Sequence, residues 1–164
     1  MKLNPRCYAC VYCQQCDKEQ EEKCRNLKYA LFTTEEDKKL LLKDLTARLT
    51  YNVKAYVKNW SKLDRKYYEG VYTVDSIHPS LNTVLACSDR FCVEVILGYD
   101  DYVINPYLFP MSEMTEEQYN QYVKYSAYES IDWLNKNHFD YRGLIEKGLA
   151  IDATNLDIYD EEDF

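Results

Sequence analysis

Five cysteines lie within the first 24 residues: Cys7, Cys10, Cys13 and Cys16 recur at three-residue intervals, and Cys24 follows. A Cys-x-x-Cys turn brings two thiolates close enough to share one ion, and a tetrahedral zinc site needs four ligands. A zinc site built from Cys7, Cys10, Cys13 and Cys16 alone would require a very tight loop. If Cys24 supplies one of the four ligands, the loop can be wider. The spacing therefore predicts a metal-binding segment and favours zinc as its cofactor.

An iron–sulfur cluster and free thiols are the alternatives for this segment. Bacterial ferredoxins carry three cysteines at the same spacing and a distal fourth ligand, which Cys16 or Cys24 could supply. However, no proline follows Cys16 and no second cluster motif is present, which disfavours ferredoxin-like electron transfer. Cys87 and Cys92 lie in apolar, strand-like stretches, and we interpret them as small buried hydrophobic residues.

Length and composition indicate one main folded domain. The chain has 164 residues, many of them aliphatic or aromatic, and only four glycines and four prolines, so it can bury a core. The first residues contain no apolar run of signal-peptide length, and no stretch approaches the roughly 20 apolar residues of a membrane helix. We therefore expect a cytoplasmic protein without membrane contact, whose thiols are reduced.

The charge is distributed unevenly along the sequence. The net charge is −8, but residues 1–66 carry +6 and residues 67–164 carry −14. Either the two halves fold against each other and partly neutralise, or the molecule has one basic and one acidic surface.

The chain divides into a cysteine-rich appendage, residues 1–27, and a single α+β domain, residues 28–164, with an acidic tail. A capping box, either Thr33 with Glu36 or Thr34 with Asp37, predicts a helix from about residue 35 to residue 48. Five β-rich stretches follow, separated by turn residues: 51–58, 70–77, 82–88, 91–97 and 101–107. Short strands with tight connections predict a small curved antiparallel sheet or an SH3-like barrel.

Helices are expected again after the strands. Capping boxes at Thr115 and Ser126 predict either two helices, over residues 116–125 and 127–136, or one broken helix, with apolar faces packed on the sheet. Asn137 is expected to close the second helix in the left-handed conformation, and a short helix is expected over residues 141–147.

Several stretches resemble a family of short uncharacterised proteins found in gut bacteria, their prophages and phages. The resemblance covers roughly residues 33–153 and is carried by "EEDKKLLLKDLTARLTYNVK", "YTVDSIHPSLNTVLA", "YLFPMSEMTEEQ" and, most specifically, "IDWLNKNHFDYRGLIEKGLAIDA". It implies a small accessory protein of mobile DNA and supplies no catalytic residue. The cysteine-rich segment lies outside the matched region.

Two aromatic stretches are candidate partner-binding sites. Tyrosines recur every three residues from Tyr119 to Tyr128, a band that is either a seam onto the sheet or a protein interface. Residues 54–68 interleave lysines with aromatic rings, as in proteins that stack bases and contact phosphates, although a solvated strand has the same composition. The residues predicted to contact a partner are Lys54, Lys58, Trp60, Lys62, Tyr119 and Tyr122.

The sequence favours a binding protein over an enzyme. His78 and His138 are the two histidines, and neither lies in a nucleophile–base signature. The leading hypothesis is a non-catalytic phage or mobile-element protein that binds a host protein, for instance as an anti-defence inhibitor. The alternative is a nucleic-acid-binding or regulatory module with a zinc-binding segment.

Overall fold

The computed structural model describes residues 34–61, 65–99 and 102–159. These residues form an α+β fold, which confirms the predicted class. The five N-terminal cysteines and Lys62 lie outside the described residues, so the expectations for them stay predictions. None of the helices in the described ranges has the length and apolar character needed to span a bilayer.

The predicted first helix is confirmed as α2 (Glu35–Arg48). Of the two possible capping boxes the second forms: the Asp37 amide donates to Thr34 Oγ1 at 3.1 Å, and the Thr34 amide donates to the Asp37 carboxylate at 3.4 Å. Leu41 and Leu45, one turn apart, are buried on the face that packs toward the sheet. A short 3-10 turn, η3 (Leu49–Tyr51), leads into the first strand.

Five antiparallel strands build most of the sheet, in the spatial order β4-β3-β2-β1-β5. All five predicted strands are present, but β1 begins and ends three residues later than expected, and β2 and β5 are longer. The strands are β1 (Lys54–Ser61), β2 (Lys66–His78), β3 (Thr83–Cys87), β4 (Cys92–Ile96) and β5 (Tyr102–Pro110). A 3-10 turn, η4 (Pro79–Leu81), connects β2 with β3.

Two short strands make the sheet mixed. β6 (Phe139–Asp140) and β7 (Ile151–Asp152) both pair in parallel with the C-terminal part of β5. The sheet curls, but within the described residues β4 does not pair with β5, so the sheet remains open and no closed barrel forms.

The core lies inside the curl of the sheet and beneath α2. Alternate residues of the strands point inward and are buried, as the period of two requires. The fully buried aliphatic residues of the strands are Ala55, Val57, Val84, Ala86, Val95 and Leu108. Side chains on the opposite face of β1 include the lysines at positions 54 and 58.

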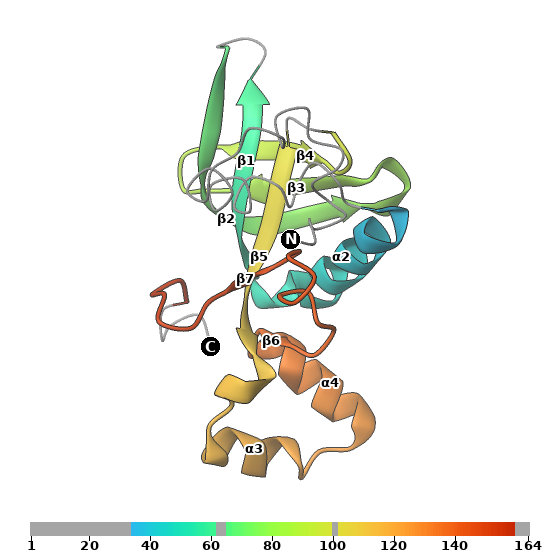
Figure 1. Cartoon of the computed structure of the whole chain (residues 1–164), viewed down its shortest axis with the longest axis vertical. Helices are drawn as coiled ribbons and strands as arrows, with labels where there is room; N and C mark the ends of the chain where they lie inside the picture. Colours follow the sequence, from blue (N-terminus) through green and yellow to red (C-terminus); the bar gives the residue numbers. More distant parts are fainter. Residues whose placement is uncertain (1–33, 62–64, 100–101, 160–164) are drawn as a thin grey trace, which may run out of the picture.

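The C-terminal helices form a lobe beyond the end of the sheet, reached by the long strand β5 (Figure 1). A 3-10 turn, η5 (Met111–Glu113), leads to α3 (Glu116–Tyr122) and α4 (Ala127–Lys136), and both predicted capping boxes are present. The expectation that these helices pack on the sheet is met only at one edge: α4 contacts the short strand β6 and also α2, whereas α3 has no buried residue.

The predicted helix over residues 141–147 is also absent, and turns take its place. Gly143 adopts a left-handed φ of 72° that a helix cannot contain. The Asp140 carboxylate accepts hydrogen bonds from the amides of Leu144 and Ile145 at 2.9 and 2.8 Å and fixes these turns. At the end of α4 the left-handed residue is His138, with a φ of 58°, rather than Asn137.

Candidate functional site

Large side chains are exposed on both helices of the C-terminal lobe and on the link between them. We call this set the tyrosine patch: Tyr119, Val123, Tyr125, Tyr128 and Ile131. Tyr128 is the most exposed, at 83%. The expectation that the tyrosine band is a seam onto the sheet is therefore wrong, and the interface alternative is the one compatible with the exposure.

Helical spacing and a few polar contacts position the tyrosine patch. Tyr119 and Val123 are four residues apart at α3, so they project from one side of that helix. The Ser130 hydroxyl on α4 forms hydrogen bonds to the carbonyl oxygens of Tyr122 and Tyr125, both at 3.4 Å, and so holds the link between α3 and α4 against α4. Tyr122, also predicted to contact a partner, is half-buried, and its ring centroid lies 6.4 Å from that of Tyr119 and 6.2 Å from that of Trp133.

The lobe that carries the tyrosine patch is acidic. Residues 111–137 contain five acidic and two basic side chains. Hydrogen bonds from the Ser126 hydroxyl and amide hold the pKa of Glu129 below its usual range, so this carboxylate is ionised at neutral pH. Asp132 accepts a hydrogen bond from the hydroxyl of Tyr51, which raises the pKa of Tyr51. Carboxylates therefore border the exposed rings.

The hairpin of β1 and β2 carries the second candidate surface, at the opposite end of the molecule from α3 (Figure 1). Trp60 and Tyr67 face each other across the strands with ring centroids 4.7 Å apart, and Lys58 Nζ lies 4.4 Å above the Tyr67 ring. Lys66 Nζ lies 4.7 Å above the Tyr68 ring. Of the predicted partner-binding residues, Lys58 and Trp60 thus lie on this hairpin, and Tyr119 lies on the separate tyrosine patch.

Lys54 has an internal role and is not part of either surface. Its Nζ donates to the carbonyl of Ile158 at 3.1 Å and lies 5.8 Å above the ring of Tyr159. The Tyr159 hydroxyl accepts from the Lys54 amide at 3.0 Å and donates to the Tyr107 carbonyl at 2.9 Å. Lys54 and Tyr159 therefore hold the segment around residues 158–159 against β1 and β5.

His138 also has a structural environment. It is completely buried, and its ring stacks on that of Tyr159 at a centroid distance of 4.0 Å. Its carbonyl accepts a hydrogen bond from the Phe109 amide at 2.9 Å. This packing was not foreseen, because Tyr159 lies in a polar, acidic stretch of sequence that has no strand or helix pattern.

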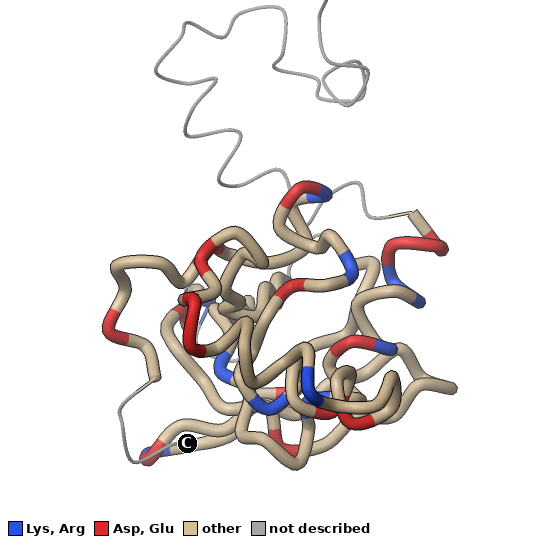
Figure 2. The backbone as a smooth tube through the Cα atoms, turned by 90° about the horizontal axis from the view of Figure 1, so that it is seen from below, with Lys and Arg blue, Asp and Glu red and all other residues tan. Residues whose placement is uncertain are grey.

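The uneven charge of the sequence does not separate into two ends of the described structure. Acidic and basic positions are interspersed along the described backbone (Figure 2). Pairs such as Glu35 with Lys38 on α2 mix the signs locally. Within the described residues, electrostatic recognition therefore depends on local groups rather than on one basic end and one acidic end.

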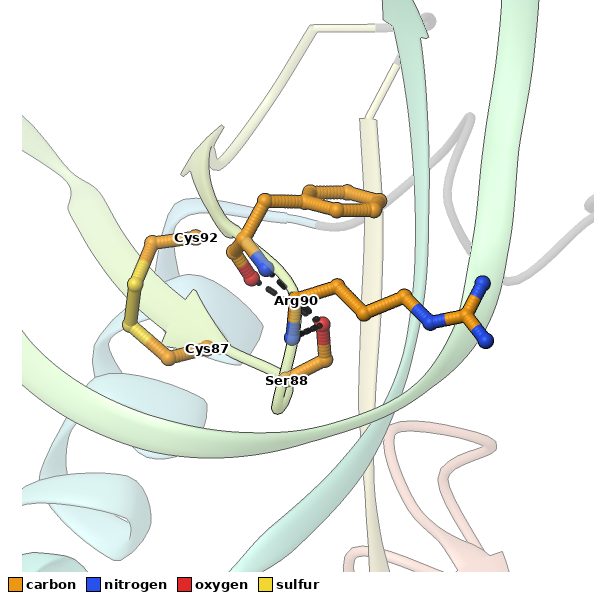
Figure 3. The surroundings of a disulfide bond; sticks show 5 residues. Cys87, Ser88, Arg90 and Cys92 are labelled. Carbon is orange, nitrogen blue, oxygen red and sulfur yellow. Dashed lines mark hydrogen bonds between the residues drawn. A yellow bond between two sulfur atoms is a disulfide. The ribbon is translucent and has the colours of Figure 1, made fainter.

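Cys87 and Cys92 form a disulfide bond (Figure 3), so their interpretation as buried hydrophobic residues is wrong. They are direct cross-strand partners in β3 and β4, with Cα atoms 4.0 Å apart, and closely spaced pairs of this kind bring two side chains together. Ser88 closes the turn between them: its Oγ donates to the Phe91 carbonyl at 3.1 Å and accepts from the amides of Arg90 and Phe91.

The described residues contain no group of three or more histidine, cysteine, aspartate or glutamate side chains placed to hold a metal ion. This finding does not reach the five N-terminal cysteines, for which zinc and the iron–sulfur alternative remain predictions. Compared with known proteins, the chain matches no protein-family model, no curated protein and no solved structure.

Proposed function

We propose that the protein is a non-catalytic accessory protein of a phage or other mobile element, and that it binds and inhibits a host protein of a defence system. The sequence resemblance supports the genomic setting. The tyrosine patch supports the binding role and is the observation on which the proposal rests.

Tyrosine is well suited to a protein interface. Its ring contributes a large contact area at a low cost in side-chain entropy, and its hydroxyl can still form hydrogen bonds. Three tyrosines, a valine and an isoleucine are exposed within residues 119–131, on two short helices and the link between them, whereas scattered single apolar residues are the norm on a monomer surface. The core of the proposed interface is therefore apolar and aromatic.

The bordering charges select the partner. With five acidic and two basic residues in the lobe, a partner surface rich in lysine and arginine is complementary. Such complementarity raises the association rate and makes it sensitive to salt. We propose a folded host protein with a basic, apolar-centred surface.

Affinity capture from host lysate tests this proposal, in parallel with and without nuclease. The full chain is compared with the double variant Tyr119→Ser/Tyr128→Ser, and with Tyr99→Ser as a matched control, because Tyr99 is 63% exposed and lies outside the patch. We expect a nuclease-resistant partner whose measured affinity falls by about tenfold or more in the double variant and is unchanged in the control. Equal affinity for all three proteins would refute the role of the patch.

A nucleic-acid-binding module is the second candidate, favoured by the two lysines held above tyrosine rings on the β1–β2 hairpin. Salt-dependent binding of oligonucleotides, lost in Lys58→Gln/Lys66→Gln, would support this candidate, because phosphate contacts release counterions. We expect no binding near physiological salt, because the chain carries a net charge of −8 that repels a polyanion.

A further inference from the structure

β4 is an edge strand whose outer side has a defined hydrogen-bonding pattern. Within the described residues β4 pairs with β3 alone. Two hydrogen bonds bracket the ladder: Ser88 amide to Phe91 carbonyl at 2.9 Å, and Leu97 amide to Asn82 carbonyl at 2.8 Å. Since bonded and non-bonded pairs alternate in an antiparallel ladder, Val93 and Val95 bond to β3. The amides and carbonyls of Cys92, Glu94 and Ile96 are directed outward.

A cleft of about 600 Å³ lies along this edge. It occupies the opening where the curled sheet does not close, between β4 and the ends of β1, β2 and β5. Four of the residues that line it are aromatic, and three are polar: Trp60, Tyr68, Phe91 and Tyr102, and Asn59, Ser61 and Glu94. The cleft therefore offers an apolar, ring-lined space directly beside a row of backbone donors and acceptors.

Phe91, which forms one wall of the cleft, is held in place by contacts within the protein. Its ring makes edge contacts with Tyr68 at 5.7 Å and with Tyr72 at 6.0 Å. The turn that carries Phe91 is closed by the Cys87–Cys92 disulfide and by the hydrogen bonds of Ser88, whereas the Arg90 side chain points away from the sulfur bridge (Figure 3). A preformed wall lowers the entropy cost of binding.

We propose that the edge of β4 and the adjoining cleft bind an extended peptide segment of a partner protein by strand addition. Main-chain hydrogen bonds to Cys92, Glu94 and Ile96 provide affinity, and side chains of the peptide provide specificity. An aromatic or aliphatic side chain enters the ring-lined cleft. Its neighbour on the other face lies opposite Glu94, whose charge selects lysine or arginine there.

The charge of Glu94 also argues against a second copy of this chain as the occupant. An antiparallel pairing of two β4 strands centred on this residue would place two carboxylates directly opposite each other, which is destabilising. The site is independent of the tyrosine patch, because α3 and the β4 edge lie at different ends of the molecule (Figure 1).

Binding of labelled synthetic peptides to the full-length chain tests the proposal by fluorescence anisotropy. The probe is a peptide of about nine residues, long enough to span a strand, in which lysine alternates with phenylalanine and valine. Its counterpart has glutamate in place of lysine. Hydrogen exchange with and without the probe measures protection of the amides of Cys92, Glu94 and Ile96.

Three substitutions at one position separate the contributions. Glu94→Pro removes an amide that makes no bond to β3, so the fold should tolerate it while strand addition is blocked. Glu94→Gln retains the amide and removes the charge, and Glu94→Lys reverses the charge. Phe91→Ala removes a half-exposed ring from the cleft, and Tyr119→Ser/Tyr128→Ser alters only the tyrosine patch.

We expect the lysine probe to bind the wild-type chain with protection of the three amides, and Glu94→Pro and Phe91→Ala each to weaken it by about tenfold or more. Glu94→Lys should prefer the glutamate probe, and the patch variant should match the wild type. A dissociation constant above about 100 μM for both probes, or equal binding by wild type and Glu94→Pro, overturns the proposal. Neither result bears on the tyrosine patch.

Discussion

Arg48 donates two hydrogen bonds to Asp44, from Nε at 2.9 Å and from Nη2 at 3.1 Å, and both side chains are completely buried. Arg142 adds a third hydrogen bond to the same carboxylate at 2.7 Å. Arg48 also donates to the carbonyl of Phe139 at 2.7 Å, just after α4. One arginine on α2 thereby connects the sheet's helix to the lobe that carries the tyrosine patch.

Replacing Arg48 with leucine should lower the free energy of unfolding by about 3 to 5 kcal/mol, because it leaves Asp44 buried with much of its compensation removed. Urea denaturation followed by circular dichroism measures the change. Lys43→Leu, an exposed substitution on the same helix, should change the free energy by no more than about 0.5 kcal/mol. Similar stability of both variants would contradict the role assigned to the pair.

Removing the disulfide with Cys87→Ser/Cys92→Ser should lower the free energy of unfolding by about 2 kcal/mol, as the loss of a cross-link closing a loop of about six residues predicts. Denaturation of the wild type and the double variant, each with and without a thiol reductant, measures this effect. A reductant should destabilise the wild type more than the variant, since the variant reports any contribution of the other five cysteines. If the reductant destabilises the wild type and the double variant equally, its effect does not come from the Cys87–Cys92 disulfide.

Much of the fold was predictable because its signals are local. The capping boxes at Thr34, Thr115 and Ser126 depend on residues three apart, and all three are present. The alternation around Ala55 and Val57 likewise identified a strand with one buried side. These patterns need no knowledge of what lies across the molecule.

The errors concern features that depend on distant contacts. Cys87 and Cys92 bond because the register of β3 and β4 makes them partners, and register is not visible in the spacing alone. The exposure of Tyr128 follows from the lobe lying beyond the sheet, which the helix signals could not reveal. The alternation along β1 and β2 gave one indication of the cleft. It places Asn59 and Tyr68, which are register partners, on the inward side of the sheet, although both side chains are polar.

Chain purified without oxygen should contain about one zinc ion per molecule, because five closely spaced thiols exceed the four ligands of a closed site. Elemental analysis measures the metal, and the variant with serine at Cys7, Cys10, Cys13, Cys16 and Cys24 is its control. A brown protein with visible charge-transfer absorption would identify an iron–sulfur cluster instead. Negligible metal in the wild type would leave the free-thiol interpretation.

The final prediction concerns alkaline pH. Burial, together with a hydrogen bond of 2.8 Å from the Tyr56 hydroxyl to Glu69, raises the pKa of Tyr56 to about 12. The unfolded chain releases this proton near pH 10, so the contribution of Tyr56 to stability is complete below pH 10 and is lost as the pH rises through 12. Tyr56→Phe should therefore lose less stability than the wild type between pH 10 and pH 12.

Urea denaturation at several pH values across this window measures the slope for each protein. Tyr128→Phe is the matched control, because it removes a hydroxyl from an exposed ring and should retain the wild-type profile. Parallel profiles for the wild type and Tyr56→Phe would show that the raised pKa of Tyr56 makes no contribution. A steeper decline in Tyr56→Phe would contradict the sign of the linkage, because a phenylalanine has no proton to release.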